Sequence, residues 1–253
     1  MTGVRVADDG RVRTVTFDRP DVLNAFDTAL YRATADALDA ARDDDGVHVV
    51  VLTGSGRAFS AGQDLGEMAK LAAGEGGTSG FPALLDALGR FDKPLVAAVN
   101  GVAIGVGFTM LAHCDLVLVA NDARFRAPFA PLGVAPEAAS SYLFPLRMGW
   151  QRAAEVLFTG DWLDARAAVE SGIALRVVPA DDLVSEAHRL AVRIAAAPLA
   201  SLRAIKQTMT AAHADAVAAA RRREDAAFAG LLSSAASRAA LDEFNARGAS
   251  SGG

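Results

Sequence analysis

Glu137 is the residue of this sequence whose surroundings most favour proton transfer. It lies in the segment 129–141, where its neighbours are apolar or small and none is basic. Apolar surroundings disfavour the charged form of a carboxyl group, so the pKa of Glu137 is expected to rise toward neutrality. A simpler interpretation places Glu137 in the first turn of a helix, where the helix dipole favours an acidic residue.

Two glycine-rich turns are the second feature with chemical potential. One spans residues 53–65 after an apolar run at 47–52, and the other spans residues 100–110 after an apolar run at 95–99. Backbone N–H groups of such turns bind phosphates, dinucleotides or an oxyanion. The second turn contains Gly105 and Gly107 but has Met110 where the dinucleotide fingerprint requires a third glycine, which weakens that interpretation.

Other nucleophile and metal patterns are weaker. Ser60 lacks the glycine two residues earlier that a nucleophile elbow needs. The run His113-Cys114-Asp115 stands where an apolar strand begins, and there it favours hydrogen bonding and packing over catalysis. The histidines are scattered, no Ser-His-acid arrangement is visible, and no spacing of histidine, cysteine and carboxylates indicates a metal site.

Composition excludes several classes of protein. The chain has 253 residues, 52% of them hydrophobic, and a net charge of -5, which argues against a nucleic-acid partner. A single cysteine, Cys114, cannot form an internal disulfide framework and suits a reducing compartment. No apolar run is long enough to cross a bilayer and the first residues form no signal segment, so we expect a soluble, cytoplasmic protein without a membrane partner.

Local patterns predict an α/β protein. Residues 4–7 and 12–17 alternate around Asp8-Asp9-Gly10 as in a β-hairpin, and residues 47–52, 95–99 and 116–120 read as buried strands. Asp27 is a candidate N-cap for a helix reaching about Arg42, and further helices are expected at 81–91, 164–171, 185–197 and 199–244. Residues 72–80 are glycine-rich and are expected to form a surface loop, or else a lid.

Four groups of residues carry a resemblance to a known family. They are Arg19-Pro20 with Asn24-Ala25, the run at 59–65, Lys93-Pro94 through Asn100-Gly101, and Cys114-Asp115-Leu116. In this combination the sequence resembles the crotonase (enoyl-CoA hydratase/isomerase) superfamily from about Val4 to Phe244. The resemblance implies a crotonase-like spiral of ββα units at 1–197 that holds the CoA and catalytic sites. It also implies a helical region at 198–253, ending in a frayed tail, that builds homotrimers, often paired into hexamers.

The same resemblance implies the ligand and the groups that bind it. The ligand is an acyl-CoA thioester, so coenzyme A belongs to the substrate and no separate cofactor is expected. The backbone N–H groups of Gln63 and Val106 are expected to hold the thioester oxygen, on which an enolate places its charge. The remaining expected substrate contacts are Asn24, Ala25, Ala61, Asp64 and Leu65 near the adenine, Gly105 beside Val106, Phe129 and Tyr142 near the acyl group, and Lys206 near the phosphates, although a solvated lysine is an equal alternative.

Two departures from the hydratase pattern decide the expected reaction. Enoyl-CoA hydratases use two glutamates, and at those positions this chain has Thr109 and Phe129, neither of which activates water well. The pattern from Pro128 to Pro145 around Glu137 instead resembles Δ3,Δ2-enoyl-CoA isomerases, especially the peroxisomal type, in which one glutamate moves a proton from C2 to C4. The alternatives are a hydratase or a thioester hydrolase that uses a water held by Glu137, and a non-catalytic acyl-CoA-binding protein.

Overall fold

Long strands, short strands and helices alternate along the chain in the computed structural model, which describes residues 3–72, 79–232, 234 and 239. The strands are β1 Val4–Asp9, β2 Val12–Phe17, β3 Val49–Gly54, β4 Ala58–Ser60, β5 Leu95–Val99, β6 Val102–Ile104, β7 Leu116–Ala120, β8 Arg124–Arg126, β9 Leu163–Asp164 and β10 Arg176–Val178. The helices are α1 Thr28–Asp43, α2 Leu65–Ala72, α3 Phe81–Arg90, α4 Val106–Thr109, α5 Ser140–Met148, α6 Trp150–Thr159, α7 Ala165–Glu170, α8 Leu183–Ala195, α9 Leu199–Ala211 and α10 Ala214–Leu232. Three 3-10 turns complete them: η1 Pro20–Val22, η2 Met110–His113 and η3 Ala180–Asp182.

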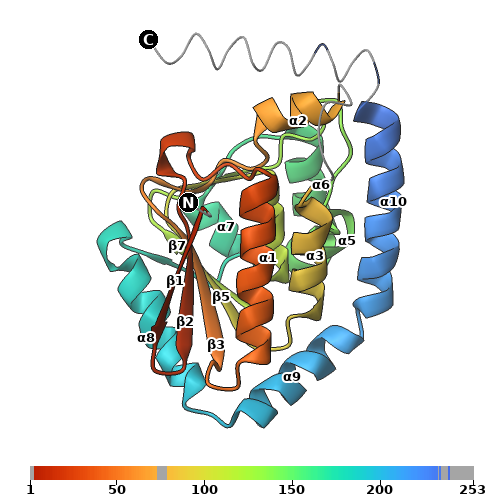
Figure 1. Ribbon diagram of the computed structural model, residues 1–253. Coiled ribbons are helices and arrows are strands. Elements are labelled where there is room, and N and C mark those ends of the chain that lie inside the picture. The colour runs from red at the N-terminus through yellow and green to blue at the C-terminus, as the bar shows by residue number, and fades with distance from the viewer. Residues whose placement is uncertain (1–2, 73–78, 233, 235–238, 240–253) are drawn as a thin grey trace.

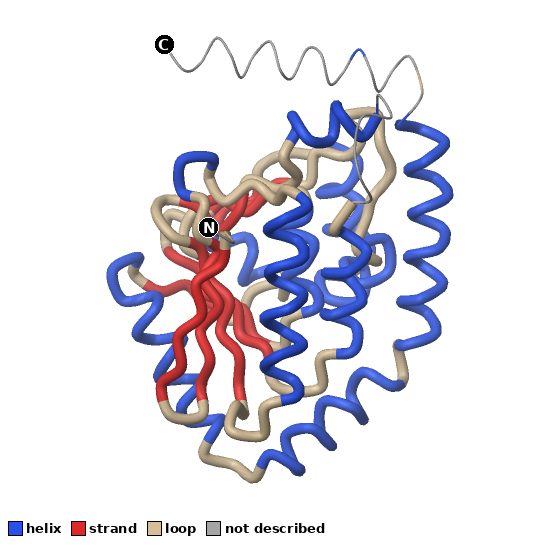
Figure 2. Tube along the Cα trace, in the orientation of Figure 1, coloured by secondary structure: helices blue, strands red, loops and turns tan. Residues whose placement is uncertain are grey.

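A six-stranded sheet forms the centre of the fold, in the order β1-β2-β3-β5-β7-β10. The predicted hairpin pairs β1 with β2 in antiparallel register, and all later neighbours in this sheet are parallel. Helix α8 packs on β3, β5 and β7, while α1 and α3 lie on the opposite face (Figures 1 and 2). Because both faces are covered, the central strands are apolar on both sides, as their sequences indicate.

The second sheet contains the short strands β4, β6, β8 and β9. Each of β3, β5 and β7 is followed first by one of these short strands and then by a helix, so the chain repeats a ββα unit as predicted. The sequence patterns do not reveal β4, β6 and β8 one by one, because three residues are too few for an alternation to stand out.

The helices largely follow their sequence signals. Helix α1 has Asp27 as its N-cap, and the Asp27 carboxylate accepts a hydrogen bond from the Leu30 amide at 2.7 Å. The expected helix at 199–244 is divided into α9 and α10 near His213. Residues 73–78 of the glycine-rich segment, and residues 249–253 at the predicted frayed end, lie outside the described residues.

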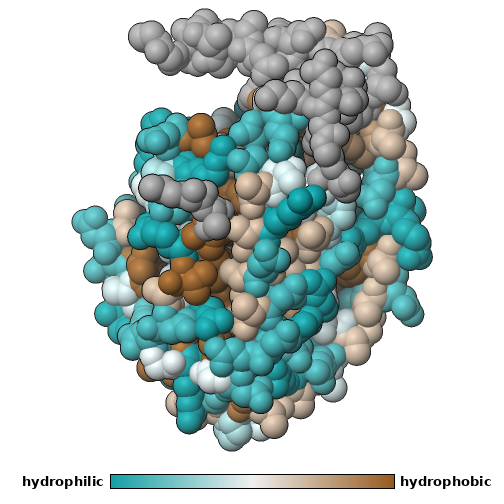
Figure 3. All heavy atoms as spheres, in the orientation of Figure 1, coloured by the Kyte–Doolittle hydropathy of each residue, from teal (hydrophilic) through white to brown (hydrophobic). Residues whose placement is uncertain are grey.

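Several apolar side chains remain exposed on the C-terminal half. Ile205 and Met209 of α9 are 56% and 65% exposed, and Trp150 and Phe158 of α6 are 75% and 76% exposed. On the face seen in Figure 3, hydrophobic and hydrophilic residues are interspersed.

The predicted trimer or hexamer stays a prediction. Within the described residues, no helix combines the length and the apolarity that a bilayer crossing requires.

The N-cap of α1 gives a test of this local assignment. Asp27→Ala removes the acceptor of the Leu30 amide and is expected to lower the free energy of unfolding by about 1 kcal/mol, whereas Asp27→Asn keeps most of it. Urea denaturation measures both variants. Asp36→Ala, on the exposed face of the same helix, is the control, and equal effects of Asp27→Ala and Asp36→Ala would contradict the assignment.

Candidate functional site

The carboxyl group of Glu137 is held by a single side chain. Its Oε1 accepts a hydrogen bond from Thr109 Oγ1 at 2.5 Å. Although the residue as a whole is half-buried, Oε2 is shut off from solvent and has no hydrogen-bond partner in the described part of the chain. Glu137 precedes α5 and the helix starts only at Ser140, so the interpretation as a first-turn residue is wrong.

Burial raises the pKa of Glu137 from its ordinary value of 4.5 to about 8. The hydrogen bond from Thr109 lowers the pKa and the charge of Glu224 raises it, but both effects are smaller than burial. The direction agrees with the expectation from the apolar sequence around Glu137. At neutral pH this carboxyl group mostly carries its proton, and a small rise in pH ionises it.

Thr109 connects this carboxyl group to the second glycine-rich turn. It is the last residue of α4, and Val106 is the first. Since a helix cannot satisfy the N–H of its first residue, the Val106 amide is free to bind a ligand. Gly105 before it has φ +51° and ψ -122°, which a residue with a side chain rarely adopts. Three residues of helix span about 4.5 Å, so Thr109, which bonds the Glu137 carboxyl group, stands about one turn along the same short helix from Val106.

The first glycine-rich turn lies directly beside the second. Strands β4 and β6 are parallel, with Ser60 opposite Ala103, and Gln63 and Val106 each stand three residues beyond that pair. A Cβ atom on Gly62 would come within 2.6 Å of the Ile104 carbonyl oxygen, so only glycine permits this approach. The amides of Gln63 and Val106 therefore belong to adjoining turns.

A short backbone ribbon positions Gln63. Phe26 forms an isolated parallel bridge with Gln63, in which the Phe26 amide donates to Gly62 O at 2.7 Å and the Asp64 amide donates to Phe26 O at 2.9 Å. In a parallel bridge the groups that flank a residue bond to its partner, so the N–H of Gln63 itself points away from Phe26. The ribbon also brings together the segments that contain the predicted adenine contacts, which are Asn24, Ala25, Ala61, Asp64 and Leu65.

Two of these predicted contacts have their side chains occupied. The Asn24 side chain is fully buried, accepts from the Arg19 amide at 2.8 Å and donates to the carbonyl groups of Ser55 and Ala58. Asp64 accepts from the amide of Glu67 at 3.2 Å, in the first turn of α2. The backbone amide of Asn24 also donates to Arg19 O at 2.9 Å, so Asn24 supports the turn and does not present its side chain to a ligand.

Tyr31 joins this group without having been predicted. Its hydroxyl donates to Gln63 Oε1 at 2.7 Å, and its side chain is 1% exposed. Burial raises the pKa of Tyr31 well above its usual range, and the charges of Glu137 and Glu67 raise it further. Tyr31 stands in the apolar stripe of α1, and nothing in the sequence distinguishes it from a core tyrosine.

The predicted acyl-group contacts lie in different surroundings. Phe129 is 6% exposed and packs in the hydrophobic core. The hydroxyl of Tyr142 is 2.9 Å from Nδ1 of His213, between α9 and α10, so its polar end is directed at the C-terminal helices.

Lys206 is not brought to this site. Its ammonium group donates to Asp115 at 2.8 Å and to the carbonyl of Lys93 at 2.9 Å, and the residue is 7% exposed. Lys93 and Asp115 come just before β5 and β7, at the amino ends of the parallel strands, whereas the two glycine-rich turns follow the carboxyl ends of β3 and β5. The alternative of a solvated lysine is wrong, because Lys206 is buried and paired with Asp115, and this position lends no support to the predicted phosphate contact.

The other polar candidates, Cys114, His113 and Ser60, are in buried or hydrogen-bonded positions. Cys114 is fully buried, and burial raises its pKa to about 12, so its thiol is not a nucleophile at neutral pH. Burial lowers the pKa of His113 to about 4 and keeps its ring neutral. The hydroxyl of Ser60 donates to the carbonyl of Asn24 at 2.9 Å. Across the residues that the structure describes, no group of three or more His, Cys, Asp or Glu side chains has an arrangement that holds a metal ion.

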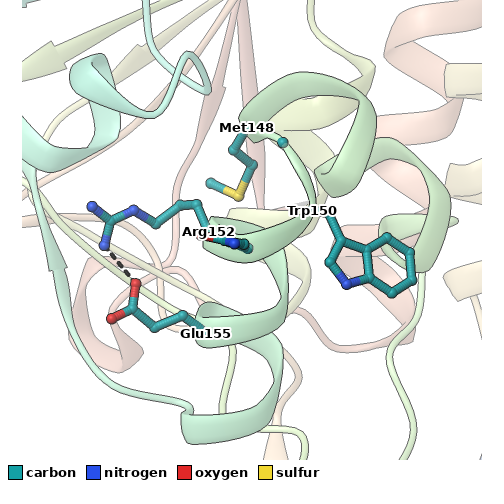
Figure 4. A pocket seen from close by; sticks show the side chains of 6 residues that line it. Met148, Trp150, Arg152 and Glu155 are labelled. Carbon is teal, nitrogen blue, oxygen red and sulfur yellow. Dashed lines mark hydrogen bonds and ion pairs between the residues drawn. The ribbon is translucent and has the colours of Figure 1, made fainter.

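A pocket at the start of α6 lies apart from these residues. Met148, Gly149, Trp150, Gln151, Arg152 and Glu155 line it. Arg152 and Glu155 form an ion pair at 2.6 Å on one side, and the Trp150 ring lies on the other side of the helix end (Figure 4). No residue of the Glu137 site takes part in it.

Comparisons with known proteins agree with the fold and the motifs. A family model described as "Enoyl-CoA hydratase/isomerase" matches residues 8–250. "Probable enoyl-CoA hydratase echA8" from Mycobacterium bovis is 34% identical over 209 residues, which are 83% of this chain and 81% of that protein. "Enoyl-CoA delta isomerase 2" from Rattus norvegicus is 37% identical over 210 residues, which are 81% of this chain and 54% of that protein.

The solved structures extend this agreement to three dimensions. The crystal structure of an enoyl-CoA hydratase/isomerase from Pseudoalteromonas atlantica has a TM-score of 0.92 to this chain at 38% identity and covers 97% of both chains. The predicted crotonase-like α/β fold is confirmed.

Lys206 offers a test of the corrected assignment. Lys206→Ala leaves Asp115 without its cation and is expected to lower the free energy of unfolding by about 3 kcal/mol. The KM for an acyl-CoA substrate is expected to stay within twofold, because the ammonium group is far from the glycine-rich turns. Urea denaturation and steady-state kinetics check this, with the exposed Arg222→Ala as control. A raised KM with unchanged stability would restore the phosphate role.

Glu137 makes stability depend on pH in a defined direction. The pKa of Glu137 is about 8 in the folded chain and near its ordinary 4.5 in the unfolded chain, so between these values only the unfolded chain loses the proton. Stability therefore falls as the pH rises from 4.5 to 8 and levels off above. Glu137→Gln has no such titration, so its free energy of unfolding should not show this fall. The difference in free energy of unfolding between the variant and the wild type is expected to be roughly 3–5 kcal/mol more favourable to the variant at pH 9 than at pH 4. Thermal melts at a series of pH values measure this, with the exposed Glu170→Gln as the control variant. The same pH dependence of stability in both variants would contradict the prediction.

Proposed function

The chain belongs to the enoyl-CoA hydratase/isomerase family, and we propose that this acyl-CoA enzyme moves the double bond of a 3-enoyl-CoA to the 2-position. The observation that carries the proposal is the buried carboxyl group of Glu137, which accepts a hydrogen bond from Thr109 of the same short helix that begins at Val106. One acid that both accepts and donates a proton is sufficient for such a shift, because the proton removed is the proton returned.

The proposed reaction has two proton transfers. The ionised carboxylate of Glu137 takes the proton from C2 of the 3-enoyl-CoA. The electron pair of that C–H bond forms the C2–C1 double bond, and the charge moves onto the thioester oxygen. The protonated Glu137 then donates to C4, the C3–C4 double bond shifts to C2–C3, and the thioester carbonyl is restored. Atoms and charge balance without a water molecule or a further cofactor.

The backbone amides of Gln63 and Val106 would hold the charge on the thioester oxygen. Both belong to adjoining turns, and the Val106 amide is also at the start of a helix. Hydrogen-bond donors fixed in this way favour the enolate over the neutral thioester and lower the barrier by several kcal/mol in related chemistry, roughly 3 kcal/mol per donor. Their contact with the oxygen would come from the backbone, while the side chains have other roles: Gln63 accepts a hydrogen bond from Tyr31, and Val106 packs in the core.

The pKa of Glu137 suits this task. A base with a pKa of about 8 removes a proton more readily than an ordinary glutamate, and a pKa near the working pH keeps both the base and its conjugate acid accessible. Thr109 supports both states, because a hydroxyl group can donate to the carboxylate and accept from the acid.

Hydration of a 2-enoyl-CoA is the second candidate. The name of the Mycobacterium bovis relative, "Probable enoyl-CoA hydratase echA8", favours it. In this chain a hydratase would have to use Glu137, because Thr109 and Phe129 stand at the positions expected for the two glutamates. Mass spectrometry of the products distinguishes the two reactions: an isomer of unchanged mass supports the shift, and a 3-hydroxyacyl-CoA supports hydration.

The decisive variant is Glu137→Gln. It keeps the size of the side chain and removes the proton carrier, so kcat for 3-enoyl-CoA isomerisation is expected to fall by about 10²- to 10⁴-fold. In the wild type, kcat/KM is expected to rise with pH through about 8 as Glu137 ionises. Glu170→Gln, an exposed matched change, should retain full activity. If Glu137→Gln kept the isomerisation rate of the wild type, the proposal would be wrong.

A further inference from the structure

In the turn that follows Glu137, both polar groups of the Ala138–Ala139 peptide bond are hydrogen-bonded by side chains. The carbonyl oxygen of Ala138 lies 2.8 Å from Nε2 of His113, and the amide of Ala139 lies 2.6 Å from Oε2 of Glu224. The other oxygen of Glu224 accepts from the Ser141 amide at 2.8 Å. Glu224 belongs to α10, more than 80 residues further along the chain, so the C-terminal helices hold this turn in place.

The backbone of this turn requires such support. Ala138 and Ala139 have φ values of +58° and +57°, which place two consecutive non-glycine residues in the left-handed region. Each such residue costs about 1–2 kcal/mol and persists only where the surroundings enforce it. Backbone N–H groups in turns of this kind converge and form a concavity that binds an anion. Helix α5 has no side-chain cap of its own, and the carboxylate of Glu224 supplies the missing acceptor.

Glu224 has no other visible use. Its side chain is 4% exposed, and no ion pair among the described residues includes it. The neighbouring Arg221 is paired with Asp86 of α3 instead, at 2.8 Å. A buried carboxylate is costly unless it is well bonded, and both bonds of Glu224 go to the turn after Glu137.

We propose that Glu224 is a positioning residue for Glu137: together with His113 it locks the Ala138–Ala139 peptide in the left-handed turn that directs the Glu137 side chain at Thr109. Thr109 ends α4, and His113 ends η2, which follows α4 directly. One short segment therefore binds both the Glu137 carboxyl group and the Ala138 carbonyl of the turn. Glu224 closes the arrangement from the opposite side. The role as stated rests on the proposed function, in which Glu137 moves the proton.

The charge of Glu224 provides a readout that structural support alone does not. This charge adds to burial in raising the pKa of Glu137. The other titratable or charged groups around the turn and Glu137 are His113, which is neutral at pH 7, and Asp225 beside Glu224. Arg147, Arg221 and Lys206 act on His113 through their charges, and Tyr31 interacts with the charge of Glu137. Neutralising Glu224 while leaving these groups unchanged should therefore move the titration of Glu137 to lower pH.

The experiment compares Glu224→Gln and Glu224→Ala with Asp215→Ala, an exposed acid of the same helix. In Glu224→Ala, kcat for 3-enoyl-CoA isomerisation is expected to fall about 10- to 100-fold while KM stays within twofold, because the proton carrier is displaced by about an ångström and the CoA contacts are untouched. Glu224→Gln keeps one acceptor and should lose less. Both variants should shift the Glu137 titration to lower pH, and the control should change nothing.

The Glu137 titration is measured directly, independently of any reaction. Infrared difference spectra against pH follow the protonated-carboxyl band that is absent in Glu137→Gln. If the wild type produced a hydroxylated product instead of the isomer, the proposed function would fail, yet the infrared titration would still decide the role of Glu224. An unchanged midpoint together with kcat within twofold would overturn the inference. So would the loss of folding in both variants by circular dichroism, because Glu224 would then support the fold in general.

Discussion

The proposed chemistry depends on a carboxyl group, that of Glu137, which is buried and whose interactions within the described chain include no cation. Hydration normally stabilises the ionised form of a glutamate. At Glu137, apolar side chains and one hydroxyl group take the place of that water. The result is a pKa of about 8 rather than 4.5. Bringing a base into this state requires a fold that can hold it tightly, because an exposed loop would let the carboxylate turn to water and regain its ordinary pKa.

The parallel strands provide this rigid support. They also place the ion pair of Lys206 and the glycine-rich turns at opposite ends of the sheet. At the amino ends of β5 and β7, Lys206 meets Asp115 and the carbonyl of Lys93, so opposite charges compensate one another and support stability. At the carboxyl ends, the glycine-rich turns contain the backbone amides of Gln63 and Val106, which have no hydrogen-bond partner shown among the described residues. Both arrangements follow from one topology, since parallel strands place all their carboxyl ends at the same edge.

The sequence predicts the parts of this fold that have a strong local pattern. The hairpin, the strands β3, β5 and β7, and the cap at Asp27 each have a period or a turn signal within a few residues, and the structure agrees. The raised pKa of Glu137 also follows from its immediate neighbours. What could not be predicted depends on residues distant in sequence: nothing near Lys206 indicates that Asp115 lies opposite, because 91 residues separate the two.

The same reason explains why Glu224 and the turn at Ala138 were not foreseen. Alanine is a helix former, and a left-handed pair of alanines contradicts its local preference, so no sequence rule suggests one. A conformation that the local sequence opposes must be stabilised from elsewhere, and that stabilisation is useful mainly where a side chain has to be aimed. The buried Lys93 is bonded to three carbonyl groups and Glu224 to two amides, whereas Glu137 has one bond and one oxygen without a partner in the described chain. An incompletely bonded acid on an enforced turn is the arrangement that leaves a proton free to move, and this contrast with its fully bonded neighbours is the physical reason to assign the chemistry to Glu137.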